Sequence, residues 1–440
     1  MKRSELVKQE EKRKKNKHRS ILCMISLTFF IFILFLSHEA IGESLKEERI
    51  ISLEKQIKKQ QEELEKLQEN LSSIEAKNDT AVQAGWDDGF YISSKDNKSR
   101  LEVSGRIEPR YEYTRNRKQY RDGSTSIIPV EWHTIDELSS FDIRRARLYF
   151  KGHIGSKKLT YRLAPEFSGG SASLRDAWID YEFYPALHIR AGQGTLPFQW
   201  HRSISSRRQF FVERSLVSRN FGYPKGRDLG VMIHGKNDLD TLYYGAGVYD
   251  GAGRNRGLST SKGNVFTGRI SYSPLGKLPR EEPDLSHSEN PQLALGIGVQ
   301  TGLHNEIRDW DLGRSINDNN RADWVTGTAD IRFAWKGLSI VADGSLRKVN
   351  PDDMEVSQYY GHGFSIATGY TIIPNKLGIV GRYSKIQLDR DVNETQETEW
   401  GLGVNLYHNK HDWKTQLQYI HHDKEETQTQ SLILQHTFVF

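Results

Sequence analysis

The feature that most constrains this chain is a two-residue alternation of apolar and charged side chains. Over residues 101–113, Leu, Val, Ile, Pro and Tyr side chains fall on one face, and Glu, Ser and Arg side chains fall on the other. Successive side chains of a β-strand point to opposite faces, and no dry protein core would accept the charged face. A membrane β-barrel has lipid outside and water inside, so it suits both faces.

Sixteen segments of this kind follow one another, mostly 9–14 residues long, which is the length that a tilted membrane strand needs. We expect a 16-stranded antiparallel transmembrane β-barrel over residues 100–440. The predicted strands are 100–113, 142–154, 158–168, 173–184, 186–194, 227–236, 240–250, 263–274, 291–302, 322–336, 337–347, 358–371, 375–388, 397–409, 411–422 and 430–440.

The connections between these segments mostly alternate between long and short, as they do in outer-membrane barrels. Residues 195–226 form the longest connection, and 275–290 is an exception where a short turn is expected. An even number of strands places both ends of the barrel on the short-turn, periplasmic side.

Residue 440 ends the chain inside a strand, and closure of this strand onto the first would remove an unpaired edge. The apolar-face aromatic residues near strand ends suit two interfacial girdles, although a β-sandwich edge is the alternative.

The first 42 residues read as a signal peptide. Nine basic residues precede an uncharged apolar run from Ile21 to Leu36, and small residues at Ala40 and Gly42 suit cleavage before Glu43. An uncleaved anchor is the alternative. Without this segment 53 basic and 53 acidic residues remain, which removes the case for a nucleic-acid partner.

The only cysteine, Cys23, lies in the same apolar run, so the mature chain has no disulfide framework or cysteine-based metal or nucleophile chemistry. We find no set of residues with the spacing of a catalytic site, a metal site or a cofactor site. A barrel hydrolase would need such a set, and we therefore predict that the protein is not an enzyme.

Residues 45–77 carry a heptad pattern, from which we predict a periplasmic coiled coil over residues 43–80 and a linker at 81–99. Mixed Ile and Leu at both core positions favours a trimer or a higher oligomer, and a lone amphipathic helix is the alternative. The two core rows of the heptad are Ile50, Ile57, Leu64, Leu71 and Leu53, Gln60, Leu67, Ile74.

Five ordered blocks between residues 141 and 253 resemble the phosphate-selective porin O/P family. They are FDIRRARL at 141–148, LRDAWIDY at 174–181, Gly-Gln at 192–193 with Pro-Phe at 197–198, SSR at 205–207 with FVERSL at 211–216, and GRDLG at 226–230. The resemblance implies a sixteen-stranded trimeric channel in the outer membrane of a Gram-negative-type bacterium. It further implies a long third loop folded into the pore and arginines that line the path of anions.

The residues themselves support an anion path. Residues 195–228 carry seven basic and two acidic side chains, and a narrow passage lined by one sign of charge concentrates ions of the other sign. Arg145, Arg147 and Lys151 share one strand face, whereas Arg144 has the opposite parity and is included on the resemblance. The predicted pore-lining cations are Arg144, Arg145, Arg147, Lys151, Arg207, Arg208 and Arg214.

Three alternatives stay open. Lumen arginines could pair with carboxylates that brace the wall, for which Glu166, Asp180, Glu182, Asp330 and Asp343 are available. Basic loop residues could instead contact lipopolysaccharide phosphates outside the cell. A rival function is a structural envelope protein, in which the coiled coil tethers the outer membrane to the cell wall. The leading hypothesis remains a trimeric channel for small anions, with phosphate as one candidate solute.

Overall fold

A computed structural model describes residues 43–78, 82–87, 89–119, 132–223, 226–255, 263–277, 280–306, 321–352, 358–388 and 395–440. The chain divides into two units, residues 1–81 and 82–440, and each is described by itself. The predicted signal peptide lies outside the described residues.

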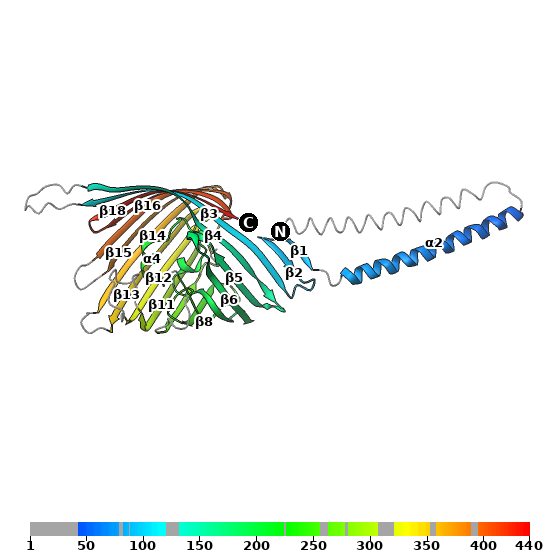
Figure 1. Ribbon diagram of the computed structural model, residues 1–440, viewed down its shortest axis with the longest axis horizontal. Coiled ribbons are helices and arrows are strands. Elements are labelled where there is room, and N and C mark those ends of the chain that lie inside the picture. The colour runs from blue at the N-terminus through cyan, green and yellow to red at the C-terminus, as the bar shows by residue number, and fades with distance from the viewer. Residues whose placement is uncertain are drawn as a thin grey trace, which may run out of the picture. The chain divides into compact units, whose positions relative to one another are not determined.

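The described residues of the first unit form one helix, α2 (Glu43–Asn78) (Figure 1). Its bounds match the helix expected from the heptads, and its pairing into a coiled coil stays a prediction. Ile50, Leu64 and Leu67 of the predicted seam are about half exposed on this single helix. Within the described residues, no helix is both long enough and apolar enough to span a membrane.

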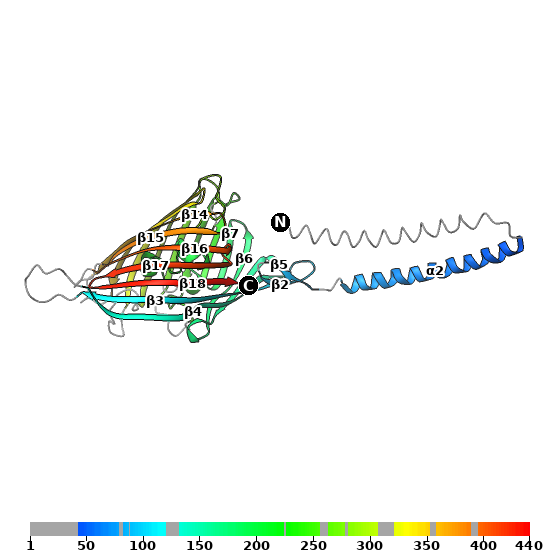
Figure 2. The ribbon, with the colours of Figure 1, turned by 90° about the horizontal axis from the view of Figure 1, so that it is seen from above.

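The second unit is a closed antiparallel barrel of sixteen strands, β3 to β18, which confirms the predicted number (Figures 1 and 2). Each observed strand overlaps the segment expected for it. The strands are β3 (Arg100–Gln119), β4 (Trp132–Ile154), β5 (Ser156–Glu166), β6 (Ser173–Tyr184), β7 (Leu187–Thr195), β8 (Arg227–Lys236), β9 (Leu242–Tyr249), β10 (Val265–Tyr272), β11 (Gln292–Glu306), β12 (Arg321–Trp335), β13 (Leu338–Pro351), β14 (Tyr359–Ile373), β15 (Leu377–Leu388), β16 (Thr395–Asn409), β17 (Trp413–Lys424) and β18 (Thr427–Val439).

The barrel closes where β18 pairs with β3, and these strands lie side by side in Figure 2. Leu434 lies opposite Tyr111 in this pairing. Phe440 and Gly105 exchange two backbone hydrogen bonds, of 2.6 and 3.0 Å. Because a bilayer offers no water to an exposed strand edge, closure satisfies the backbone groups that an open sheet would leave unpaired.

The alternation in sequence becomes an alternation between two environments. On β18, Leu432, Leu434 and Phe438 face outward and are exposed, whereas Gln435 and Thr437 face inward and are buried. The inner face is therefore the polar one, the reverse of a soluble protein and the arrangement of a membrane barrel.

A short hairpin extends one end of the wall within the predicted linker. It consists of β1 (Gln83–Trp86) and β2 (Phe90–Ser93). Strand β2 pairs with the first four residues of β3, with Phe90 opposite Val103. The segment 81–99 is therefore partly ordered against the barrel.

Most connections follow the predicted alternation of lengths. At one end of the barrel β4 and β5 are joined through Gly155, and β12 and β13 through Lys336 and Gly337. The connection between β10 and β11 is the exception at this short-connection end, and its residues Glu282, Asp284 and Leu285 are buried. At the other end, residues 196–226 join β7 and β8.

We predict that Leu434→Arg destabilises the barrel by about 2–4 kcal/mol, because it places a cation near the middle of the lipid-facing surface. Leu434 is 45% exposed and lies near the centre of β18. Denaturant unfolding of the refolded protein in lipid vesicles measures this loss. Gln430→Arg, on the same face nearer the strand end, is the matched control and should cost about 0–1 kcal/mol. Equal losses for both variants would contradict a membrane-embedded outer face.

Candidate functional site

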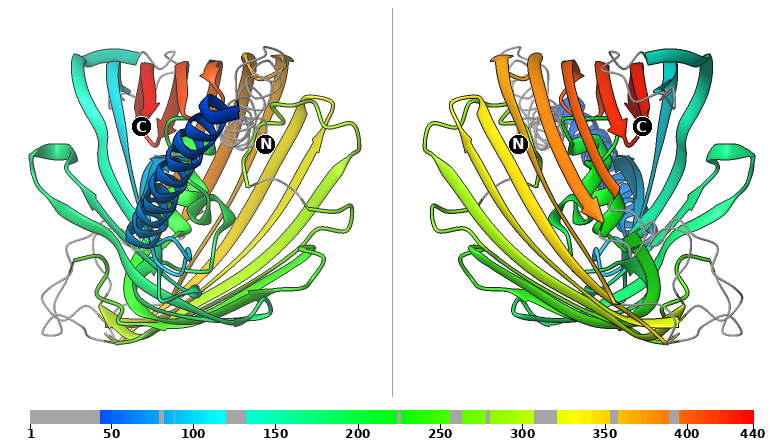
Figure 3. Two further views of the ribbon diagram at one scale, coloured as in Figure 1. Left: turned by 90° about the vertical axis from the view of Figure 1, so that its right-hand side faces the viewer. Right: turned by 90° about the vertical axis from the view of Figure 1, so that its left-hand side faces the viewer.

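The connection between β7 and β8 folds into the barrel. It contains α3 (Trp200–Ser203), the 3-10 turn η3 (Ser206–Arg208) and α4 (Leu216–Phe221), and the views along the barrel show it inside the ring of strands (Figure 3). We call residues 196–226 the inner loop. Its position agrees with the third loop that the family resemblance implied.

Apolar side chains of the inner loop pack against the inner wall. Phe210 and Phe211 cluster with Val341, Ala367 and Val380 from the strands. Strand glycines make room for these rings, since a Cβ atom at Gly369 would overlap the ring of Phe210. The burial of these aromatic side chains stabilises the loop at the centre of the barrel.

Polar side chains of the wall satisfy the backbone of the inner loop. The side-chain amides of Asn405, Gln416 and Gln418 each donate to the carbonyl oxygen of Phe210 at 2.9 Å. The Gln418 side-chain oxygen accepts from the backbone N–H of Val212 at 3.0 Å. A buried backbone without such partners would be costly, so these inward-facing amides hold the loop in place.

The long connection between β10 and β11 supports the inner loop from the short-connection end. The Glu282 carboxylate accepts a hydrogen bond from the backbone N–H of Phe210 at 2.6 Å. The backbone N–H of Glu282 donates to the carbonyl oxygen of Arg208 at 2.9 Å. His201 lies 3.0 Å from Glu282 and 3.2 Å from Asp343 of β13. The connection between β10 and β11, which is longer than the alternation of loop lengths predicts, therefore gives the inner loop a second support.

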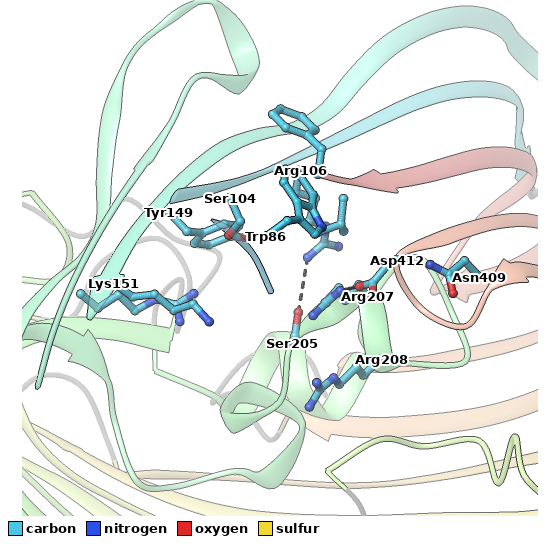
Figure 4. Close-up of a pocket in the computed structure, with 13 residues that line it drawn as sticks. Trp86, Ser104, Arg106, Tyr149, Lys151, Ser205, Arg207, Arg208, Asn409 and Asp412 are labelled. Atoms are coloured by element: carbon cyan, nitrogen blue, oxygen red, sulfur yellow. Dashed lines mark hydrogen bonds and ion pairs between the residues drawn. The ribbon is translucent and has the colours of Figure 1, made fainter. Parts of the chain in front are cut away.

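A cavity of about 450 Å³ lies between the inner loop and the wall (Figure 4). Five basic side chains and one acidic side chain line it. The basic ones are Arg106, Lys151, Arg162, Arg207 and Arg208, the acidic one is Asp412, and the other lining residues include Ser104, Tyr149, Ser205 and Asn409. We call this space the basic cavity.

Most cations of the basic cavity have a carboxylate partner. Arg106 pairs with Glu108, Arg207 with Asp412, and Lys151 with Glu102 at 2.7 Å. Figure 4 shows the Arg208 side chain extending away from Asp412. Among the residues that the structure describes, Arg208 forms no ion pair, and Glu281 is a carboxylate whose charge still interacts with it. Arg208 is therefore the cation of this cavity with the most freedom to meet a solute.

Three of the seven predicted cations, Lys151, Arg207 and Arg208, line the basic cavity. Three others form ion pairs: Arg145 with Glu108 at 2.6 Å, Arg147 with Glu166 at 2.5 Å, and Arg144 with Glu213 at 2.6 Å. These contacts match the alternative in which arginines brace the wall. Arg214 donates to the carbonyl oxygens of His201 and Ile204, at 3.0 and 3.5 Å, and holds the inner loop in shape.

Strand parity alone assigned Arg144 to the wrong face. Glu108 lies opposite Arg145 and the next residue, Pro109, lies opposite Ile143, so Arg144 is the extra residue of a β-bulge. A bulge re-aims the side chain that it carries. The Arg144 side chain therefore points inward and donates to Glu213 of the inner loop, although a regular alternation of faces would place it on the outer face.

Two cations of the basic cavity were not predicted, Arg106 and Arg162. Arg106 donates to the hydroxyls of Ser205 and Ser206, at 3.4 and 3.1 Å, and so joins the wall to the inner loop. The guanidinium of Arg162 lies 4.8 Å from the ring centre of Tyr149. Both lie on polar strand faces, so extending the parity argument to every strand would have included them.

A second cavity, of about 370 Å³, lies between the inner loop and strands β7–β10 and β12. It is basic as well, with five cations against the single carboxylate of Asp240. These cations are Lys236, Arg269, Lys277, Arg280 and Arg332. Arg269 and Arg332 pair with Asp330 at 2.6 and 3.2 Å. Basic cavities thus flank the inner loop on two sides.

Comparison with known proteins agrees with this architecture. Residues 130–336 and 349–438 match the family described as phosphate-selective porin O and P. An uncharacterized protein of Aquifex aeolicus (strain VF5) is 23% identical over 278 residues, covering 58% of this chain and 65% of the relative.

Two solved structures share the fold at low identity. One is an anion-selective porin from Comamonas acidovorans, with a TM-score of 0.54 and 12% identity, covering 78% of this chain and 100% of the other. The other is OmpT of Vibrio cholerae in a trimer form, with a TM-score of 0.52 and 9% identity, covering 78% and 100%. These similarities establish a porin-type barrel.

We predict that His201→Gln loosens the inner loop and lowers the free energy of unfolding at pH 7 by about 1–3 kcal/mol, through the loss of charged hydrogen bonds. Burial lowers the pKa of His201, but Asp343 and Glu282 outweigh it and raise that pKa to about 10. Because the unfolded value is about 6.5, the stabilisation is complete below about pH 6.5 and is lost as the pH rises through about 10.

Urea unfolding midpoints at pH 7 and pH 10 test this expectation. The wild-type protein should lose more stability than His201→Gln over this interval, and the exposed His362 provides the control variant His362→Gln. An equal loss in wild type and His201→Gln would show that the charge on His201 does not hold the loop.

Proposed function

The chain belongs to the phosphate-selective porin O and P family, and from this premise we propose that it is an outer-membrane diffusion channel that prefers small anions. The observation that carries the proposal is the basic cavity, with five cations against one carboxylate beside the inner loop. A narrow passage with low-dielectric walls and an excess of one charge raises the local concentration of ions of the opposite charge.

The balance of paired and unpaired cations suits permeation. Arg106 and Arg207 are paired with carboxylates that compensate most of their charge, so they bind a solute only weakly. Arg208 and the 41% exposed side chain of Lys151 offer transient contacts. Conduction needs binding strong enough to favour entry and weak enough to permit exit. In this scheme Arg144, Arg145 and Arg147 shape the wall, and Arg214 shapes the loop.

Inorganic phosphate is a candidate solute by its chemistry. Guanidinium donates two parallel hydrogen bonds to phosphate or carboxylate oxygens and stays charged at all working pH values. Arg106, Arg162, Arg207 and Arg208 present four such groups around one cavity. The anion-selective character named for the Comamonas porin supports the anion preference.

We also propose a trimer in the outer membrane, with α2 in the periplasm and lipopolysaccharide around the barrel. The trimer form of the Vibrio porin supports this assembly. The exposed Ile50, Leu64 and Leu67 of α2 supply a seam that association of three copies would bury. The same seam favours a second candidate function, in which α2 tethers the outer membrane to the cell wall.

We predict that Arg208→Glu lowers the ratio of chloride to potassium permeability by about two- to tenfold, because it replaces by an anion a cation of the basic cavity that forms no ion pair with the described residues. Reversal potentials in planar bilayers under a salt gradient measure this ratio. Arg321→Glu, at an exposed site on the outer surface, is the matched control and should leave it unchanged. Cation preference in the wild type would refute the anion channel, and phosphate that fails to block the chloride current would remove phosphate as a solute.

The hypothesis that α2 tethers the outer membrane to the cell wall leads to a separate prediction. Deletion of residues 43–78 should leave single-channel conductance unchanged, since α2 and the barrel form separate units. Vesicle release and detergent sensitivity of cells that carry the deletion test the tether: increases in both would support it, and normal envelopes would count against it. The wild-type gene expressed from the same promoter is the control.

A further inference from the structure

Three lumen-facing side chains outside the basic cavity converge on one point. Asp180 lies on β6, His188 on β7 and His234 on β8, three neighbouring strands. His188 and His234 lie directly opposite each other in the pairing of β7 with β8. The register of the barrel therefore brings together residues that are eight and 46 positions apart in sequence.

The ligating atoms of this group face one another. His188 Nδ1 lies 3.1 Å from one oxygen of Asp180, and His234 Nε2 lies 2.7 Å from the other. The two imidazole rings are stacked with centres 4.8 Å apart and planes 20° apart, and a nitrogen of each ring contacts the same carboxylate. All three ligand atoms lie within 4.8 Å of one another.

The two histidine–carboxylate distances are close to the spacing of ligands around a metal ion. Four ligands placed tetrahedrally around Zn²⁺ at its usual 2.0–2.1 Å bond length lie about 3.3 Å from one another. A cation that replaces the shared protons would need only small movements of the side chains. We propose that Asp180, His188 and His234 form a binding site for a divalent transition-metal ion, for which Zn²⁺ is the test ion.

The surroundings supply an entrance and a fourth position. Asp180 is 3% exposed, whereas His188 and His234 line the second cavity of about 370 Å³. Three protein ligands with an open fourth position describe an exchangeable zinc site rather than a closed structural one. Water or a small anion in the cavity would complete the coordination.

Arg190 decides which ions suit the site. Its Nε donates to Asp180 at 2.7 Å, and its guanidinium lies 4.1 Å from the ring centre of Trp178. This contact orients the carboxylate, as outer partners of metal ligands do. Its positive charge opposes any cation, which favours ions with strong affinity for imidazole, namely Cu²⁺, Ni²⁺ and Zn²⁺, over Mg²⁺ and Ca²⁺.

Calorimetric titration of the full-length folded protein with ZnCl₂ tests the proposal. We expect one ion per chain, and an affinity at least about tenfold weaker in His188→Ala and in His234→Ala, since even outer partners of a metal contribute about that much. The control is His422→Ala, because His422 lies 3.1 Å from Glu397 as a single histidine–carboxylate pair on the same inner wall. This variant should bind zinc as the wild type does.

The difference in mobility between unheated and heated samples on SDS gels, which distinguishes folded from unfolded barrels, verifies each variant, and His188→Gln and His234→Gln replace any alanine variant that fails to fold. Electron paramagnetic resonance of the Cu²⁺-loaded wild type gives an independent readout, with nitrogen hyperfine structure from two imidazoles. The absence of stoichiometric zinc binding, unchanged affinity in the double histidine variant, or a copper spectrum without two nitrogen ligands would each overturn the site. Because none of these measurements uses ion flow, their outcome is independent of the channel's anion preference.

Discussion

Every feature of this protein depends on one requirement: backbone N–H and C=O groups surrounded by lipid must find partners within the protein. Sixteen strands meet this requirement only when the last pairs with the first, which β18 and β3 do. Closure separates two surfaces, and the separation permits charged side chains on half of each strand. The arginines and glutamates that would disrupt a soluble core thus become the lining of a watery interior.

The same requirement acts again inside the barrel. The inner loop carries buried backbone groups of its own, and the wall satisfies them with Asn405, Gln416 and Gln418 from one side and with Glu282 from a connection at the barrel end. The loop is consequently supported by specific polar contacts as well as by aromatic burial. Its fixed position divides the interior into separate basic cavities.

The charges of the interior fall into two groups with different consequences. Arg145 and Arg147 are buried against Glu108 and Glu166, and removing either partner of such a pair would leave an uncompensated charge. These pairs stabilise the wall. Arg208 lines the basic cavity and forms no ion pair with the described residues, so it is the cation assigned to solute contact in the proposed channel. The basic residues of the interior thus stabilise the wall and supply the charge on which the proposed anion preference rests.

The number of strands, their approximate bounds and the inward face of Arg145, Arg147 and Lys151 could be predicted from the sequence, because alternation is a local property. The entry of the long loop into the barrel was expected only from the family resemblance. Strand parity failed at Arg144, where a bulge turns the side chain inward. The tertiary structure alone decided which cations have partners, that the connection before β11 supports the inner loop, and that Asp180, His188 and His234 meet. Such outcomes depend on the register between strands and on distances between segments far apart in sequence, and no local pattern of residues encodes them.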